Sequence, residues 1–311
     1  WLQGAACVAE LMESNPELHG HIVLLSDGYA NRGILSSIVL QEHADPLRAR
    51  GVRTSTVGIG DDYSSTILLK LAEYGGGRMH DAQHPQEIVE VVMGELTEIL
   101  ETFVQDISVE LKFPVGVKVT NICHFPDSVG SSSLIARLGS LPYKASRRIV
   151  LRLQVPPKEK NSRLQFQCTV AGQNPDTNEI MHIEKEVELK YAGKKAVENS
   201  KRNEEMSRIV AETWQASILR RASELNRSRD FTELKRYLDH ELNYFTTYCE
   251  GLEGTQYLVT ELSLLRKNAD TDWQERLRKE MEITSYQYQT TTNDYRIFKR
   301  DRWSETMGEG L

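Results

Sequence analysis

The stretch His21-Ile22-Val23-Leu24-Leu25-Ser26-Asp27-Gly28 decides the fold of this chain. Its apolar residues follow one another without polar alternation and end abruptly at an acid and a glycine. Such a run is typical of a strand that is buried on both faces of a parallel sheet. In open α/β sheets, ligands bind beyond the carboxyl ends of the strands, which is where Asp27 lies. Because Asp-Gly is also ordinary turn chemistry, the stretch alone leaves a binding role for Asp27 open.

The chain around this stretch alternates between strand and helix patterns. Helical patterns precede and follow it, at residues 1–12 and 36–50. Further along, the pattern predicts a strand, a helix, a short strand and a longer helix, at residues 54–59, 64–74, 78–80 and 85–100. This alternation predicts parallel strands that are joined by right-handed crossovers.

The last of these helices is amphipathic and has Pro85 in its first turn. Its apolar side consists of Ile88, Val91, Val92, Leu96 and Ile99. An apolar stripe of this kind normally faces the core, so we expect these five side chains to be buried.

Two segments resemble a known family. "HIVLLSDGYANRGI" and then "GVRTSTVGIGDDYSSTILLKLAEYGGGRMHDA", followed by a long helix, resemble the second half of a von Willebrand factor A (vWA) domain. The resemblance covers about residues 1–101. It implies that Asp27 matches the last acid of the family's metal-ion-dependent adhesion site, which usually acts on Mg²⁺ through a water molecule.

The other ligands of that site do not occur before Asp27. The family's Asp-x-Ser-x-Ser motif and its metal-site threonine precede this strand, but the chain begins at Trp1, in a helix that resembles the one just after the threonine. We therefore expect the sequence to be a piece of a longer chain that supplies these ligands upstream. Residues 21–26 would then form an exposed edge strand, and residues 1–311 would bind Mg²⁺ negligibly.

Other candidate sites are weaker. His80 and His84 flank Asp81, but we expect them in a strand-to-helix loop, where a metal site is a minor alternative. Gly75-Gly76-Gly77 lacks the Lys-Ser/Thr of a phosphate loop and follows a helix, where glycine provides a left-handed cap. The cysteines show no C-x-x-C spacing that would indicate zinc.

The pattern changes after residue 102. Alternating apolar residues indicate an antiparallel β-sandwich over residues 103–192, with half-buried strands near residues 107–113, 115–119, 149–155, 164–170 and 181–191. Residues 193–283 then follow helical spacing, with Leu238 and Leu242 expected to be buried. Residues 284–311 are polar and predict a poorly ordered tail. This succession also resembles bacterial proteins in which an A domain precedes a β-sandwich and a helical region.

Composition narrows the class of protein. The chain has 311 residues, of which 39% are hydrophobic, and no apolar run approaches the roughly 18 residues of a membrane-spanning helix. Residues 1–102 contain 15 acidic and 6 basic side chains, which disfavours nucleic acid as a partner. The compartment stays open, with the cytoplasm slightly favoured.

Together, these patterns predict a partial α/β vWA domain, an antiparallel β-sandwich and a C-terminal helical bundle. The resemblance implies a non-enzymatic protein-binding module that depends on a divalent cation such as Mg²⁺ in the parent chain, where a carboxylate of the protein partner would complete the coordination. A first alternative is a regulatory subunit or adaptor of a MoxR-type AAA+ ATPase. A second is a hydrolase that uses the cleft after Leu25.

Overall fold

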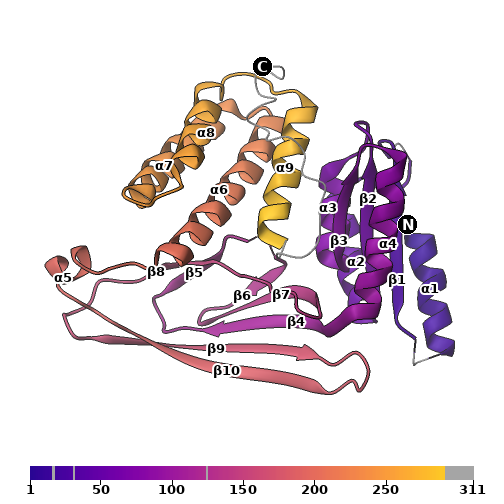
Figure 1. The fold of residues 1–311 in the computed structure, drawn as a ribbon, viewed down its shortest axis with the longest axis horizontal. Coiled ribbons are helices and arrows are strands. Elements are labelled where there is room, and N and C mark those ends of the chain that lie inside the picture. The colour runs from indigo at the N-terminus through magenta and orange to yellow at the C-terminus, as the bar shows by residue number, and fades with distance from the viewer. Residues whose placement is uncertain (16–17, 31, 124, 291–311) are drawn as a thin grey trace.

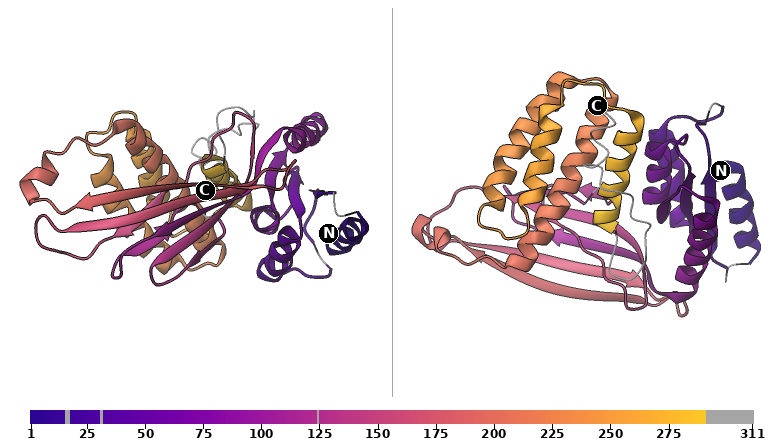
Figure 2. Two further views of the ribbon diagram at one scale, coloured as in Figure 1. Left: turned by 90° about the horizontal axis from the view of Figure 1, so that it is seen from below. Right: turned by 45° about the horizontal axis from the view of Figure 1, so that its top comes forward.

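A computed structural model describes residues 1–15, 18–30, 32–123 and 125–290 of the protein (Figure 1). The chain forms three regions: a parallel sheet with flanking helices, two antiparallel sheets, and a group of helices (Figure 2). The helices stand on the antiparallel sheets and lie beside the parallel region (Figure 1).

The parallel region contains the predicted alternation of strands and helices. Its elements are α1 (Leu2–Ser14), β1 (Gly20–Ser26), α2 (Ser37–Ala49), β2 (Val52–Ile59), α3 (Ser65–Gly75), β3 (Gly76–Ala82) and α4 (Pro85–Glu101). Leu24 of β1 lies opposite Thr56 of β2, and Val57 of β2 lies opposite His80 of β3, both in parallel register. The predicted parallel sheet is therefore confirmed, although β3 is longer than residues 78–80.

β1 is an edge strand. The strand order is β1-β2-β3, and within the described part of the chain β1 pairs with β2 alone. Leu25 of β1 is exposed, and its neighbours Val23 and Leu24 are only half-buried. This agrees with the edge position that we expected for residues 21–26.

Helix α4 is oriented differently from our prediction. Val91 is buried, and Ile88 and Val92 are half-buried, but Leu96 and Ile99 are exposed. The predicted burial of these last two side chains is wrong. The side of the helix that faces the sheet instead includes a glutamate, Glu95, whose polar partners on β1, β2 and β3 are described below.

The antiparallel region consists of a five-stranded sheet and a two-stranded sheet. Its strands are β4 (Thr102–Lys112), β5 (Lys118–Asn121), β6 (Asp127–Val129), β7 (Ser133–Pro142), β8 (Leu151–Gln154), β9 (Arg163–Gln173) and β10 (Ile180–Lys190). The order is β10-β9-β4-β7-β6 in one sheet and β5-β8 in the other, with antiparallel pairing throughout. The antiparallel prediction is confirmed.

Three details of this region differ from the prediction. Strand β7, which pairs with β4 near the middle of the larger sheet, was not anticipated. Val115 lies in a turn before β5, and not in a strand. Strand β10 is an edge strand that pairs with β9 alone among the described strands, and its apolar residues are largely exposed, with Ile183 72% exposed.

The helical region has its own apolar core. It contains α5 (Lys194–Glu198), α6 (Glu204–Arg227), α7 (Phe231–Cys249), α8 (Gln256–Lys267) and α9 (Glu275–Thr290). Leu238 is fully buried in this core as predicted, whereas Leu242 is only partly buried at its edge. Within the described residues, no helix is both long and apolar enough to cross a membrane.

The predicted disorder of the tail is wrong for its first residues. Helix α9 continues to Thr290, and Tyr286 is buried. The Tyr286 hydroxyl accepts a hydrogen bond of 3.2 Å from the backbone N–H of Met79 in β3, which ties α9 to the parallel sheet. The remainder of the predicted tail, residues 291–311, lies outside the described residues.

Candidate binding site at the carboxyl end of the parallel sheet

Asp27 lies where the sequence places it, directly after the last residue of β1. It is exposed, in a turn where the Ser26 hydroxyl donates a 3.0 Å hydrogen bond to the carbonyl oxygen of Gly28. A Cβ atom at Gly28 would lie 4.0 Å from the carbonyl oxygen of Asp62. The turns after β1 and β2 are therefore neighbours, and together they form the carboxyl end of the sheet.

The turn after β2 is built around Tyr63. Its ring is fully buried against β2, where a Cβ atom at Gly58 would come within 2.2 Å of it, so this position requires glycine. The Tyr63 hydroxyl donates a hydrogen bond to Asp81 in β3. Lys279 of α9 also contacts this turn. Its Nζ atom lies 3.8 Å from the centre of the Tyr63 ring and 2.5 Å from the carbonyl oxygen of Asp61. A helix more than 200 residues away in sequence thus caps the carboxyl end of β2.

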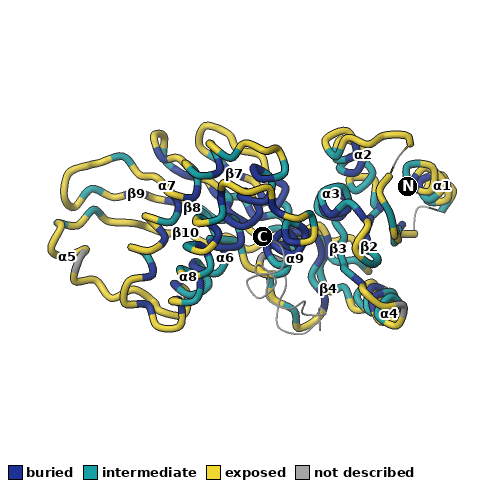
Figure 3. Tube along the Cα trace, turned by 90° about the horizontal axis from the view of Figure 1, so that it is seen from above, coloured by how far each residue is buried: buried dark blue, intermediate teal, exposed yellow. Residues whose placement is uncertain are grey.

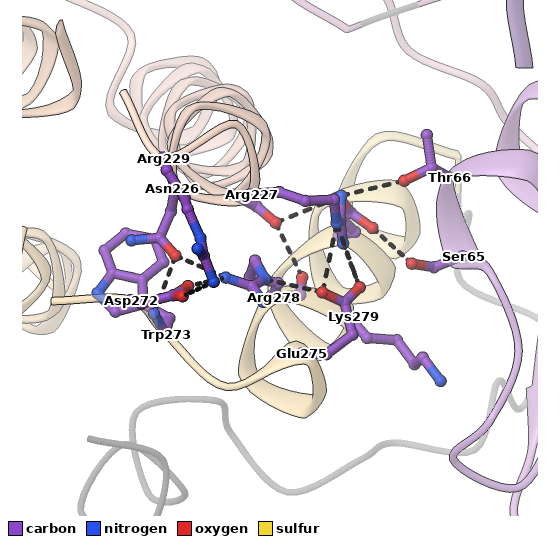
Figure 4. Close-up of polar contacts among 12 residues, drawn as sticks. Ser65, Thr66, Asn226, Arg227, Arg229, Asp272, Trp273, Glu275, Arg278 and Lys279 are labelled. Carbon is purple, nitrogen blue, oxygen red and sulfur yellow. Dashed lines mark hydrogen bonds and ion pairs between the residues drawn. The ribbon is translucent and has the colours of Figure 1, made fainter. Parts of the chain in front are cut away.

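A second group of polar contacts joins the helical region to the start of α3 (Figure 4). Ser65 donates a 2.6 Å hydrogen bond to Glu282, and Arg227 donates a 3.0 Å hydrogen bond to the Thr66 hydroxyl. Arg227 also forms ion pairs with Glu282 and, at 2.7 Å, with Glu275. Burial alone would lower the pKa of Arg227, but hydrogen bonds and charges of the two glutamates raise it above its usual value. Arg227 is therefore permanently charged here.

An open cleft lies between these elements, with a volume of about 400 Å³. Its lining combines hydroxyl groups from the parallel region, an ion pair from the helical region and two apolar side chains: Tyr29, Ser37, Ser64, Thr66, Arg227, Glu275, Leu35 and Ile67. Partial burial, and then the charge of Glu275, raise the pKa of the Tyr29 phenol, so this hydroxyl stays protonated and can donate a hydrogen bond. The cleft therefore suits a ligand that accepts and donates hydrogen bonds and also has an apolar part.

The sequence did not identify this lining. The predicted residue, Asp27, lies in the neighbouring turn and does not line the cleft, whose residues come from the loop after β1, from α2 and α3, and from α6 and α9. No local pattern marks Arg227 or Glu275, because their role depends on a contact between regions that are 161 residues apart at Arg227 and Thr66.

The residues present do not by themselves form the magnesium site that the resemblance implies. Within the described part of the chain, no group of three or more His, Cys, Asp or Glu side chains is arranged to hold a metal ion. Asp27 offers one carboxylate, and Mg²⁺ gives up its water only for near-octahedral oxygen ligands. The ligand role of Asp27 therefore stays a prediction.

The alternative His80–Asp81–His84 group is not brought together. His80 lies within β3 rather than in a loop, and its Nε2 atom is 2.5 Å from Glu95 of α4. Asp81 accepts the hydrogen bond from Tyr63, and His84 caps the start of α4 in a reciprocal arrangement with Glu87.

Glu95 is the centre of a buried polar network that the sequence did not predict. The Ser55 hydroxyl donates a 2.5 Å hydrogen bond to it, and His21 and Arg78 lie 3.3 Å and 3.4 Å from its carboxylate. Burial opposes ionisation of Glu95, but its hydrogen bonds with His21 and His80 and the charge of Arg78 hold its pKa well below the usual value. A glutamate on the sheet-facing side of α4 therefore stays charged.

This network does not have the arrangement of a catalytic triad. The same nitrogen of His21, Nε2, faces both Ser55, at 3.1 Å, and Glu95. A triad instead uses the two opposite ring nitrogens for the nucleophile and the acid. Ser55 is also completely buried. We interpret the network as a means of holding α4 on the sheet.

Comparisons with known proteins agree with the fold. No family model and no curated protein matches the chain. A solved structure described as von Willebrand factor type A from Catenulispora acidiphila superimposes with a TM-score of 0.60 at 12% identity, covering 93% of this chain and 69% of that chain. The chain has the von Willebrand factor A fold. The ArnB paralog VWA2 from Sulfolobus acidocaldarius gives a TM-score of 0.45 at 18% identity, over 93% of this chain and 68% of that one.

The likeness to the vWA structure extends beyond the parallel region. Since it covers 93% of this chain, it includes the antiparallel sheets and the C-terminal helices as well. The predicted succession of a vWA-like α/β part, an antiparallel part and a helical part is therefore confirmed as a fold. The expected bacterial origin and upstream extension stay predictions.

Proposed function

We propose that this protein is a non-enzymatic, vWA-type protein-binding module that contacts its partner at the carboxyl end of the parallel sheet. The observation that carries the proposal is the position of Asp27, exposed at the end of β1 on the edge where open α/β sheets bind ligands. In the natural chain the contact depends on a divalent cation such as Mg²⁺, and a carboxylate of the partner completes the oxygen coordination.

The cleft supports this proposal. Ser37, Ser64, Thr66 and Tyr29 provide hydroxyl groups beside the turn that carries Asp27, and such groups can bind polar side chains or backbone of a partner. Because Arg227 lines the same cleft from α6, a bound partner would contact the helical region as well as the sheet.

Affinity capture with the natural chain that contains residues 1–311 tests the proposal. We expect a protein that is retained in Mg²⁺, released by EDTA, and lost on Asp27→Ala. The matched control is Asp176→Ala, which removes an exposed acid from the turn between β9 and β10, far along the chain from the cleft. Equal retention by both variants would contradict the proposed site.

Two further results would favour the alternative functions. A retained AAA+ ATPase, with ATP turnover that changes when the module is added, would favour the regulatory role. Turnover of ester or phosphate substrates by the purified chain, lost on Asp27→Asn, would favour a hydrolase.

A further inference from the structure

A small polar cavity lies at the amino ends of the parallel strands, opposite the end that carries Asp27. Its volume is about 20 Å³, and its lining includes the second residue of β2, Arg53, and the first residue of β3, Gly76. The other charged and polar members come from β1, β3, α4 and the antiparallel region: His21, Arg78, Glu95, Glu98, Ser140 and Arg147. None of the described residues that line this cavity also lines the cleft near Asp27.

Two hydrogen-bond donors of the lining have no partner among the described residues. Ser140, in β7, is 7% exposed, and its Oγ atom makes no hydrogen bond. The Nε atom of Arg147, in the loop after β7, is likewise shielded from solvent and makes none, whereas Nη1 of the same side chain donates to the carbonyl oxygen of Leu138. Buried polar atoms of native proteins nearly always have a partner, and an arginine N–H can only donate. The two atoms therefore indicate that the cavity holds a hydrogen-bond acceptor.

These donors lie at the junction of β3 and β7, away from the open edge of the parallel sheet. A Cβ atom at Gly139 would lie 3.4 Å from Nη1 of Arg147 and 3.6 Å from the carbonyl oxygen of Gly76. In the order β1-β2-β3, β3 is the edge opposite β1. Figure 3 shows β3 in teal and dark blue, whereas α1, beyond β1, is largely yellow. A segment that continued the sheet beyond β1 would be separated from the two donors by β1 and β2.

The charges of the lining do not balance. Arg78 pairs with both glutamates, with its Nε atom 3.4 Å from Glu95 and a second contact to Glu98. Arg147 forms no ion pair with a carboxylate among the described residues, and its printed polar partner is a backbone carbonyl oxygen. Burial lowers the pKa of Arg147 to about 10, so this side chain is still charged at neutral pH. Its positive charge is therefore without a counterion.

Arg53 adds to this excess of positive charge. Its guanidinium donates a 2.8 Å hydrogen bond to the neutral side chain of Gln105. Burial lowers the pKa values of Arg53 and Arg48, and the charge of Asp106 acts against this in both. One exposed acid is thus shared by two arginines. A water molecule would satisfy the unpaired donors but leave the charge uncompensated, whereas an anion would do both.

We propose that this cavity binds a small monovalent anion of the size of chloride, held by the hydroxyl of Ser140 and the guanidinium of Arg147. A volume of about 20 Å³ accommodates a single particle about as large as a water molecule, and not a tetrahedral oxyanion such as phosphate or sulfate. Arg53 and Arg78 belong to the parallel sheet, whereas Ser140 and Arg147 belong to the antiparallel region. The anion therefore connects the two regions.

Thermal unfolding of residues 1–311 tests the proposal. Sodium chloride replaces sodium gluconate at constant ionic strength, so that screening of surface charges stays the same while the anion that fits the cavity is varied. We expect the unfolding midpoint to rise by about 2–4 °C and then to level off, as it does for a ligand that binds the folded state alone. Bromide should act like chloride, and its anomalous X-ray scattering in crystals should locate it between Ser140 and Arg147.

Variants locate the effect in solution. Ser140→Ala removes one unpaired donor, and we expect it to weaken chloride binding by about tenfold. Arg147→Met removes the charge and should abolish the response to chloride. The matched controls are Ser128→Ala, on the exposed strand β6, and Arg163→Met, at an exposed position of β9, and both should respond like the wild type. Because Ser140→Ala deletes a single oxygen atom, it provides the test even if Arg147→Met does not fold.

Three results would overturn the proposal. A midpoint that does not depend on chloride would show that the cavity holds water. An equal response of the wild type, Ser140→Ala and Arg147→Met would show that chloride acts elsewhere on the surface. A longer natural chain that is insensitive to chloride, although residues 1–311 respond to it, would show that a side chain of that longer chain occupies the position.

Discussion

Helices α4 and α7 are both amphipathic, and the sequence predicts both helices. The apolar side of α7 is covered by neighbouring helices, whereas α4 leaves several apolar side chains exposed. Leu238 of α7 is 1% exposed between α6 and α8, whereas Leu100 of α4 is 86% exposed. Periodicity therefore predicts that a helix has an apolar side, but burial of that side requires a second element. That element is supplied by distant residues, or by another chain.

The largest expected effect comes from the contact that holds the covered helices to the parallel region. Arg220 of α6 and Glu73 of α3 form a two-point ion pair, with both side chains nearly buried. Arg220→Met leaves the Glu73 charge without its main partner, although Lys70 remains 3.7 Å away. We expect a loss of about 3–5 kcal/mol of unfolding free energy in urea.

The control for Arg220→Met is the neighbouring, exposed ion pair between Arg221 and Glu224. Arg221→Met removes an ion pair with Glu224 that is half open to water, and such pairs contribute at most about 1 kcal/mol. A similar loss for Arg220→Met and Arg221→Met would show that the buried pair does not hold the regions together.

A matched pair of leucines tests the comparison of the two helices directly. Leu238→Ala should destabilise the protein by about 2–5 kcal/mol, because it opens a cavity in the helical core. Leu100→Ala should change stability by less than about 0.5 kcal/mol, since its side chain is already in water. Equal shifts of the denaturation midpoint in the two variants would mean that the Leu100 side chain is covered in solution.

The sequence predicted the fold where local patterns carry the information, and failed where distant contacts do. The apolar runs of β1 and β2 identified the parallel sheet, although only β2 is buried along most of its length. Strand β7 was missed because Gly139 and Pro142 interrupt its apolar pattern. Tyr286 was assigned to a disordered tail because its neighbours are polar, but its hydroxyl contacts Met79, 207 residues away in sequence.

The same reasoning applies to the candidate site. A strand that ends in an acid predicted the position of Asp27. The side chains that line the cleft come from both ends of the chain, so no spacing could bring them together. Glu95 was overlooked because a glutamate between apolar helix positions normally faces water, and its polar partners lie on three strands.

A smaller effect, limited to a range of pH, is expected at Glu95. Because folding lowers its pKa, ionised Glu95 stabilises the protein above the pKa of an unfolded glutamate, about 4.3, and this contribution disappears as the pH falls. The groups that face it are His21, His80, Arg78 and the Ser55 hydroxyl. Glu95→Gln should cost about 1.5–3 kcal/mol at neutral pH.

The pH dependence identifies the cause of that loss. The difference between the wild type and Glu95→Gln should shrink as the pH falls below about 4.3, when urea unfolding is measured across the acid range. Glu90→Gln, on the exposed side of the same helix, should follow the wild type. A constant difference at every pH would show that shape, and not charge, accounts for the effect of Glu95.

The smallest effect is expected at Asp27, which lies at the site with the clearest functional interpretation. Unlike Glu95, Asp27 is exposed and supplies one carboxylate, while within the described residues no group of three metal-binding side chains surrounds a common point. A single carboxylate rarely replaces the water around Mg²⁺. Calorimetric titration of residues 1–311 with MgCl₂ should therefore show no saturable binding, and Asp27→Ala should change stability by less than about 0.5 kcal/mol. In a longer natural chain that supplies further ligands, the same substitution should abolish metal-dependent partner binding. Tight Mg²⁺ binding by residues 1–311, lost on Asp27→Ala, would instead mean that the site is complete in this chain and that its ligands come from residues other than those the resemblance implies.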